Sequence, residues 1–310
     1  MTRDSSGTRS ELARTFEQSV SQGTVAWLGD RPAELARALR FALGRFAEGE
    51  RLFAVLRSKQ TRPMSELRVL DLGCGDGGVC FGLAASGVIG RLVALDKDVN
   101  AVLRTVRRSS PSLQYVLARA EALPFPNGSF DVVICLESFE HFTRPRDVGR
   151  EVMRVLSPGG LCILKTPCRL KYLLRPDPHC GIRGLVLLPD ALQRLVVNRL
   201  LRRRPPYDVH HTYWHLGEIL EHFPGYGFLE VIWDKPFPTT NWLLDHLWFK
   251  YRFFHWENLL IQKRDPARPC APSRWQEWPF PFAQLTDAET PLLLPAGGES
   301  QGDGRGAPAR

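Results

Sequence analysis

A glycine-rich loop with acidic residues around it is the part of this sequence best suited to bind a ligand. The segment VLDLGCGDGG, residues 69–78, passes from strand-like apolar residues into glycines. Gly73 and Gly75 allow a tight turn and a close approach of the backbone to a ligand. Asp96 ends the next apolar run, where a carboxylate can accept charge-assisted hydrogen bonds from both hydroxyls of a ribose. We therefore expect a nucleoside site.

The charges around the loop separate two kinds of nucleoside ligand. Gly73, Gly75 and Gly78 satisfy the pattern G-x-G-x-x-G, which is typical of NAD(P)-dependent oxidoreductases. A pyrophosphate needs a helix amino terminus without acids, and here Asp71 and Asp76 flank the loop. These acids suit a phosphate-free ligand with an ammonium and a sulfonium group, such as S-adenosylmethionine. We favour S-adenosylmethionine and keep the oxidoreductase as the alternative.

Four histidines are candidates for a catalytic base, which an acceptor hydroxyl would require. They are His141, His179, His210 and His211. Histidine suits this role near neutral pH, although each of the four, taken singly, also fits a structural role. We favour His179, because the prolines on both sides of Asp177 in the loop RPDPHCG fix its position.

The cysteine spacing gives no sign of a metal site. The seven cysteines include no C-x-x-C pair, which argues against a disulfide framework and a zinc ribbon and favours a reducing compartment. Cys168, His179 and Cys180 match no common zinc pattern. We expect no metal site and a cytoplasmic protein.

The elements that position these residues follow from the apolar pattern. Between residues 67 and 167 short apolar runs alternate with helical stretches, which is typical of a parallel sheet with crossover helices. Strands are expected at 68–72, 91–95, 113–117, 130–136 and 161–165, and helices at 78–86, 99–109 and 146–156. A turn, SPGG at 157–160, ends the last helix. Two further strands are expected at 227–233 and 258–262.

Four sequence blocks follow the order found in one enzyme family. They are VLDLGCGDG (69–77), LDKD (95–98), AEALPFPNGSFDVV (120–133) and LSPGG (156–160). Together they resemble the class I S-adenosylmethionine-dependent methyltransferases of the methyltransferase type 11 family. The resemblance implies a methyltransferase with a Rossmann-like α/β fold. Its sheet would be seven-stranded and mainly parallel, with the last strand antiparallel and helices capping the cofactor cleft.

The resemblance also assigns roles to individual residues. The methionine moiety is expected at Asp71, Gly73 and Gly75, the ribose at Asp96, and the adenine near Ala120 and Glu121. The full expected cofactor-binding set is Asp71, Gly73, Cys74, Gly75, Asp96, Lys97, Ala120, Glu121 and Glu137. The catalytic candidates are His179, His141 and His210, and Glu137 and His141 are expected beside the reacting methyl group.

One residue departs from the family pattern. Such enzymes commonly place an acid just before the Ala-Glu pair, where it reaches the adenine amino group, and here that residue is Arg119. Arginine cannot accept that hydrogen bond, but it can stack on the ring. Arg119 also lends some support to a second alternative, a non-catalytic partner protein that binds the cofactor.

The chain of 310 residues divides into four expected segments. Residues 1–60 form a helical extension with an interruption near Gly49, 61–167 the cofactor-binding core, 168–263 the acceptor-binding cap with the last two strands, and 264–310 a mostly disordered tail. The amino terminus is polar and does not resemble a secretory signal. No apolar run is long enough to span a membrane.

Basic and aromatic segments suggest what the acceptor is. The net charge is +8, which favours an anionic partner. Residues 241–256, NWLLDHLWFKYRFFHW, interleave aromatic residues with cations, which is typical of a segment in contact with a membrane surface; a helix packed on the sheet is the alternative. Residues 175–213 loosely resemble methyltransferases of glycan or glycolipid assembly. We expect methylation of an oxygen on a sugar, glycolipid or other lipid-linked small molecule, at the inner face of the membrane, and no nucleic acid.

Overall fold

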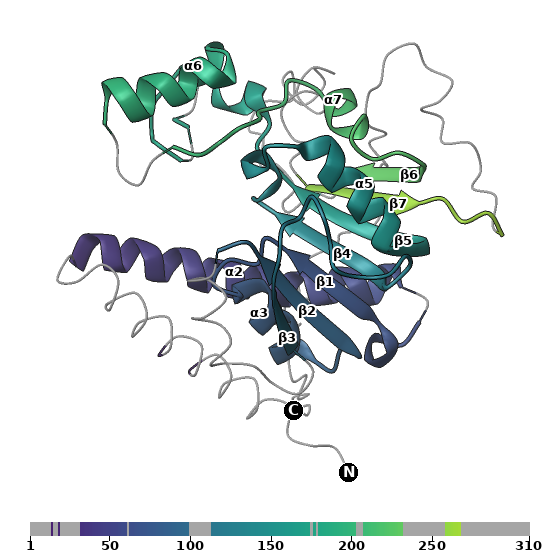
Figure 1. The fold of residues 1–310 in the computed structure, drawn as a ribbon. Helices are drawn as coiled ribbons and strands as arrows, with labels where there is room; N and C mark the ends of the chain where they lie inside the picture. Colours follow the sequence, from purple (N-terminus) through teal and green to yellow (C-terminus); the bar gives the residue numbers. More distant parts are fainter. Residues whose placement is uncertain are drawn as a thin grey trace, which may run out of the picture.

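One seven-stranded sheet organises the part of the chain that the computed structural model describes, namely residues 14, 18, 32–60, 62–98, 113–173, 176–177, 179–202, 207–231 and 258–267. Its spatial order is β3-β2-β1-β4-β5-β7-β6 (Figure 1). The strands are β1 (Arg68–Leu72), β2 (Arg91–Asp96), β3 (Leu113–Leu117), β4 (Phe130–Leu136), β5 (Leu156–Lys165), β6 (Tyr226–Val231) and β7 (Asn258–Lys263). The strands expected at 68–72, 113–117 and 130–136 have these bounds.

The strand directions place a ligand site at one edge of the sheet. Strand β1 pairs in parallel with β2 on one side and with β4 on the other, while β7 lies antiparallel between β5 and β6. The chain thus builds outward from β1 to β3 and then returns to β4. In such sheets ligands bind beyond the carboxyl ends of the strands where this reversal occurs. The predicted mainly parallel sheet with an antiparallel last strand is confirmed.

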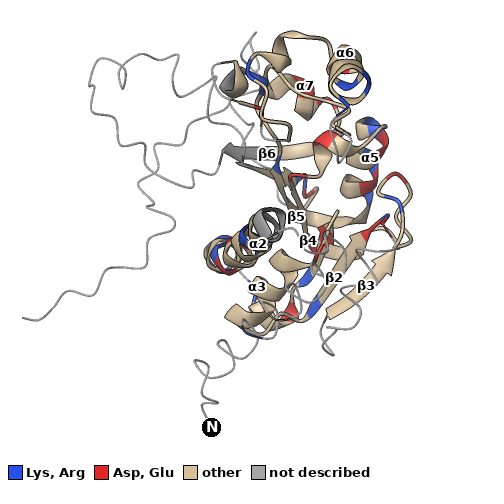
Figure 2. Ribbon diagram, turned by 90° about the vertical axis from the view of Figure 1, so that its left-hand side faces the viewer, with Lys and Arg blue, Asp and Glu red and all other residues tan. Residues whose placement is uncertain are grey.

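Helices cover both faces of the sheet, as Figure 2 shows for α2 and α3 on one side and α5 on the other. Because successive residues of a strand point to opposite faces, Val69 packs with Phe46 of α2 (Pro32–Lys59) and with α3 (Gly78–Ser86). Leu70 packs with Val148 of α5 (Pro145–Val155) and with α7 (Leu216–Leu220). Among the described residues no helix has the length and apolar character needed to cross a bilayer.

Helix α2 runs without interruption through Gly49, where the sequence predicted a break. A Cβ atom on Gly49 would lie 2.2 Å from the carbonyl oxygen of Val79, and one on Gly82 would lie 2.0 Å from the carbonyl oxygen of Phe46. The two glycines therefore allow α2 and α3 to pack backbone against backbone. Gly49 therefore does not break the helix; it lets α2 pack closely against α3.

The other differences from the predicted elements are local. Strand β5 begins at Leu156, so the expected SPGG turn at 157–160 lies within the strand. Phe130 pairs with Leu156 and Val132 pairs with Leu161, and the pairing of β4 with β5 therefore contains a bulge. The predicted helix at 99–109, the aromatic segment 241–256 and the tail beyond residue 267 lie outside the described residues.

A cap of short helices follows β5. It contains η3 (Arg169–Tyr172), η4 (Leu185–Leu187), α6 (Asp190–Leu195) and the π-helical η5 (Val196–Leu200). Tyr207 and Val209 pack with Leu185 and Val197 into a small core of its own. The buried Arg169 joins cap and sheet, because its guanidinium donates to the Val186 carbonyl and stacks 4.7 Å from the centre of the Trp214 ring.

At the amino-terminal ends of the parallel strands, a salt bridge between Arg68 and Asp131 joins β1 to β4. The Arg68 guanidinium donates to both carboxylate oxygens of Asp131, at 3.0 and 2.8 Å. This contact outweighs the effect of burial, which alone would raise the pKa, and holds the pKa of Asp131 below its usual range. Asp131 of the third family-like block is therefore a structural residue.

We expect Gly49→Ala to lower the free energy of unfolding by ~1–3 kcal/mol, because the added methyl group overpacks the contact with α3. Gly44 is the matched control, since it lies in the same helix and a Cβ atom added there would meet no described neighbour within 4 Å. Gly44→Ala should raise stability by ~0.5–1 kcal/mol through helix propensity. Urea unfolding of both variants tests this; equal effects would contradict the packing role of Gly49.

Candidate active site

The loop between β1 and α3 has a backbone that only glycine adopts without strain. Gly73, Gly75 and Gly77 have φ angles of 77°, 52° and 76°, in the left-handed region. A Cβ on Gly73 would lie 2.6 Å from the Ser138 hydroxyl oxygen, so the loop packs closely against the segment that follows β4. The ends of β1 and β4 thus meet at this loop.

The amides of this loop already have acceptors within the protein. The amides of Gly73 and Cys74 donate to the Leu95 carbonyl at 2.8 and 3.0 Å, and the amide of Gly75 donates to Oδ2 of Asp96 at 2.9 Å. A diphosphate would need such amides as donors. With these three amides used and a carboxylate among their acceptors, the loop is unsuited to a diphosphate.

Asp71 is a buried carboxyl group directly beneath the loop, with 1% of its surface exposed. Burial raises the pKa of Asp71 to about 6, while the positive charge of Arg45 and the Cys80 thiol, which donates to Oδ2 at 3.2 Å, act against this rise. Keeping a carboxylate out of water is unfavourable unless a cation faces it. The site therefore favours a positively charged group above Asp71.

Asp96 stands at the end of β2 with both oxygens oriented by the backbone. Oδ2 accepts from Gly75, and Oδ1 accepts from the amide of Asp98 at 2.9 Å. Each oxygen keeps a further lone pair, which is the arrangement that two neighbouring hydroxyls require. Lys97, in the same turn, is exposed.

The expected adenine region lies beyond β3. Ala120 is buried, and the amide of Ala118 donates to the backbone carbonyl of Asp96 at 3.1 Å, so this segment is tied to the end of β2. The carboxylate of Glu121 lies between Nε of Arg119 at 3.6 Å and the hydroxyl of Thr143 at 3.4 Å. Arg119 therefore pairs with Glu121.

Glu137 follows β4 with a φ angle of 52°, which is uncommon for a residue other than glycine. Its amide donates to the Lys165 carbonyl at 2.7 Å, and its carboxylate lies 3.0 Å from Nζ of Lys165 and 3.7 Å from Arg45. Burial raises the pKa of Glu137, but these two cations outweigh burial and hold the pKa below its ordinary value. Glu137 is thus an oriented anion at the strand ends.

Helix α2 supplies part of the site. Arg45 donates to Glu48 at 2.8 Å and to the Leu136 carbonyl at 2.8 Å, and Glu48 lies 2.9 Å from Nζ of Lys165. No sequence pattern singled out Arg45, Glu48 or Lys165. The only signal was the spacing of Arg45 and Glu48, one helical turn apart, which also fits an ordinary surface ion pair.

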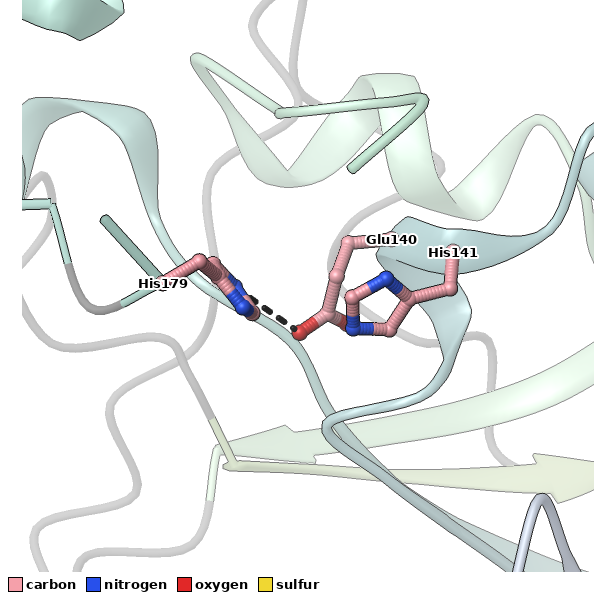
Figure 3. Close-up of side chains that lie close together, drawn as sticks. All are labelled: Glu140, His141 and His179. Carbon is pink, nitrogen blue, oxygen red and sulfur yellow. Dashed lines mark ion pairs between the residues drawn. The ribbon is translucent and has the colours of Figure 1, made fainter. Parts of the chain in front are cut away.

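Three side chains converge beyond β4, and we call them the Glu140 cluster: Glu140, His141 and His179 (Figure 3). Glu140 and His141 belong to η2 (Phe139–His141), and His179 comes from the segment of the cap between η3 and η4. Oε1 of Glu140 lies 3.8 Å from Nε2 of His179, and the His141 and His179 rings are perpendicular with centroids 5.1 Å apart. Burial raises the pKa of the fully buried Glu140 to about 7.

Neighbouring residues fix each member of the cluster. Nδ1 of His141 lies 3.0 Å from a carboxylate oxygen of Asp208. The Asp177 carboxylate accepts from the amides of His179 and Cys180, both at 2.9 Å, which fixes the loop. His210 and His211 contribute backbone amides, which donate to the Glu140 carbonyl at 2.8 and 3.1 Å.

The structure therefore brings together two of the predicted histidines. His141 and His179 meet at Glu140, which was not among the predicted site residues although it precedes His141. Asp208 was not predicted either, because its contact with His141 joins residues far apart in the chain. The catalytic roles assigned to His141, His179 and His210, and the roles of the cofactor-binding set, remain predictions.

Comparisons with known proteins agree on one family. Residues 70–164 match the family model described as a methyltransferase domain. The chain is 34% identical over 123 residues to the uncharacterized methyltransferase YcgJ of Bacillus subtilis, covering 38% of this chain and 47% of YcgJ. It is 36% identical over 109 residues to a ubiquinone biosynthesis O-methyltransferase of Albidiferax ferrireducens, covering 34% and 42%. The matches thus span less than half of these relatives.

A solved structure is similar over a larger part of the chain. The structure of Bacillus subtilis YcgJ superposes with a TM-score of 0.45 at 20% identity, covering 69% of this chain and 98% of that chain.

The buried Asp71 makes stability depend on pH. Its pKa is higher in the folded chain, about 6, than the ~3.9 of an unfolded chain. Protonated Asp71 does not oppose folding below pH ~4. As the pH rises from ~4 through 6, its ionisation lowers the free energy of unfolding by an amount on the order of 3 kcal/mol. We expect Asp71→Asn to be more stable than the unliganded wild type at pH 7.5 and similar to it near pH 4, in urea unfolding. A stability difference that does not change with pH would contradict this.

Proposed function

We propose that this protein, whose residues 70–164 match the family model of a methyltransferase domain, binds S-adenosylmethionine and transfers its methyl group to an oxygen of a sugar, glycolipid or other lipid-linked acceptor. One observation carries the choice of cofactor. The loop of Gly73–Gly75 has used its amides on Leu95 and Asp96, and Asp71 lies buried beneath it. This site favours a cationic nucleoside over a diphosphate, and therefore disfavours the NAD(P)-dependent alternative.

The residues present fit such a ligand in three places. Asp71 and the glycine loop would face the ammonium group, Asp96 would accept from the ribose hydroxyls, and the segment of Ala120 and Glu121 would border the adenine. When bound, the ligand supplies an electrophilic methyl group on a positively charged sulfur. Glu137, held as an anion by Lys165 and Arg45, adds to the negative potential that favours this charge.

The acceptor is expected beside the Glu140 cluster. An acceptor oxygen forms its bond to the methyl carbon while the carbon–sulfur bond breaks, leaving a neutral thioether and releasing the hydroxyl proton. Well-oriented reactants gain ~7–11 kcal/mol from positioning, so most of the work of the residues here is to align the acceptor. The side chains of His141 and His179 are 23% and 26% exposed. Both are expected to border the acceptor, and each offers a nitrogen lone pair that can accept the hydroxyl proton.

The cap supports an acceptor with an apolar part. Leu192, Leu195 and Leu200 are 45%, 48% and 71% exposed on α6 and η5, on an element that also carries Arg199. An apolar surface beside a cation suits a lipid whose headgroup is anionic. The relative named for O-methylation in ubiquinone biosynthesis supports transfer to oxygen. Membrane contact through 241–256 is part of the proposal and lies outside the described residues.

We expect Asp96→Asn to weaken the binding of S-adenosylhomocysteine by about 10- to 100-fold, because the charge-assisted hydrogen bonds to the ribose are lost. Isothermal titration calorimetry measures this. Asp147→Asn is the control, since Asp147 lies on α5 and pairs with Arg144 and Arg150. Binding of NAD with no binding of S-adenosylhomocysteine would favour the oxidoreductase instead.

The acceptor class is tested with S-adenosylmethionine that carries a radiolabelled methyl group. Incubated with cell extract and purified protein, the label should enter the lipid or glycan fraction and resist mild alkali, because a methyl ether is stable where a methyl ester is not. Asp96→Asn should lower the rate of incorporation. Label confined to protein or nucleic acid would contradict the proposed acceptor, and cofactor binding without incorporation would favour the non-catalytic alternative.

A further inference from the structure

We propose that the Glu140 cluster binds a divalent transition-metal ion, with zinc(II) as the ion that its ligands suit best. The cysteine spacing predicts no metal site, but this cluster contains no cysteine. One ligand atom from each of Glu140, His141 and His179 can be chosen so that all three lie within 4.8 Å of one another. Two histidines and a glutamate are a ligand set found in catalytic zinc sites.

The three ligand atoms lie within 4.8 Å of one another, and the pair formed by Glu140 and His179 needs only a small adjustment to accommodate an ion. Tetrahedral ligands at the usual bond lengths of ~2.0–2.1 Å lie about 3.3 Å apart. Oε1 of Glu140 and Nε2 of His179 are 3.8 Å apart, which is too long for a hydrogen bond between them. An ion between the two atoms would be within reach after a shift of under 1 Å.

A second observation points to a missing ligand at the same place. Glu140 is fully buried, and its Oε1 has no hydrogen-bond partner among the described residues, whereas Oε2 accepts from the Thr166 hydroxyl at 3.1 Å. A buried carboxylate oxygen without a partner is costly. Oε1 is the oxygen that faces His179 (Figure 3), so a cation bound there would satisfy it.

The surroundings of the histidines are those of metal ligands. Asp208 occupies Nδ1 of His141 at 3.0 Å, which leaves Nε2 as the nitrogen with a free lone pair. A carboxylate on the other nitrogen is the usual outer partner of a metal-binding histidine. His179 is fixed by the Asp177 turn, and the second oxygen of Asp177 lies 3.3 Å from the hydroxyl of Tyr207.

The site leaves a position for a further ligand. Glu140 is closed off from water, but His141 and His179 keep about a quarter of their side chains exposed. Three protein ligands with an open fourth position are the arrangement of catalytic zinc. This step rests on the proposed function. The acceptor hydroxyl would bind at the open position and lose its proton to solvent, because the ion would lower the pKa of the hydroxyl. His179 would then act as a ligand, and its role as a free base would not be needed.

Zinc binding by the purified full chain tests the proposal. After treatment with EDTA and dialysis, calorimetric titration with zinc chloride should show one ion bound per chain with micromolar or tighter affinity. Glu140→Gln and His179→Ala should each weaken binding by ~100-fold or more, because even the outer partners of a ligand contribute ~10–100-fold. His215→Ala is the control, since His215 pairs with Glu218 away from the cluster.

Two further readouts keep the result interpretable. Cobalt(II) should give visible absorption typical of a tetrahedral site in the wild type and not in Glu140→Gln, and zinc should raise the melting temperature of the wild type only. Glu140→Gln removes a buried charge, so we expect it to fold, and circular dichroism checks this. Absence of zinc binding, or equal binding by wild type and Glu140→Gln, would overturn the metal site. S-adenosylhomocysteine binding by the same preparation reports separately on the proposed function.

Discussion

A buried carboxylate beneath a loop whose Gly73, Cys74 and Gly75 amides already bond within the protein is the constraint on which the rest of this site depends. Asp71 lies at the end of β1 with almost no exposure, and the loop above it turns through Gly73 and Gly75 so that its amides bond Leu95 and Asp96. An anion at this place would meet a carboxylate and few donors. A cation would neutralise Asp71 and release the unfavourable energy of its burial. The fold thus selects the charge of its ligand before any contact with the nucleoside is made.

The same edge of the sheet is completed by elements from distant parts of the chain. Helix α2 brings Arg45 and Glu48 to the ends of β4 and β5, where they hold Lys165 and Glu137 in one network. Close packing of α2 on α3 through Gly49 and Gly82 places that helix. Helix α2 is therefore part of the site, and the segment of the cap between η3 and η4 adds His179.

Much of the sheet could be predicted from the sequence, because β1, β3 and β4 are short, mainly apolar runs, and β1 and β4 end directly before Gly73 and Glu137. The loop of Gly73 and Gly75 and the position of Asp96 followed from local spacing in the same way. Other features depend on contacts between distant residues, which a local pattern does not carry. A glycine at position 49 looks the same in the sequence whether it breaks a helix or packs against the backbone of α3. Glu140 can be recognised as a site residue only after folding brings His141 and His179 close to it.

An experimental structure of the protein with S-adenosylhomocysteine tests most directly whether the site at the glycine loop holds a phosphate-free nucleoside and favours positive charge. We predict that the amino group of the ligand lies on the Asp71 side of the glycine loop and that both ribose hydroxyls lie within hydrogen-bond distance of Asp96. A ligand bound elsewhere on the chain, or a diphosphate coenzyme seated on the amides of Gly73 and Gly75, would contradict the account.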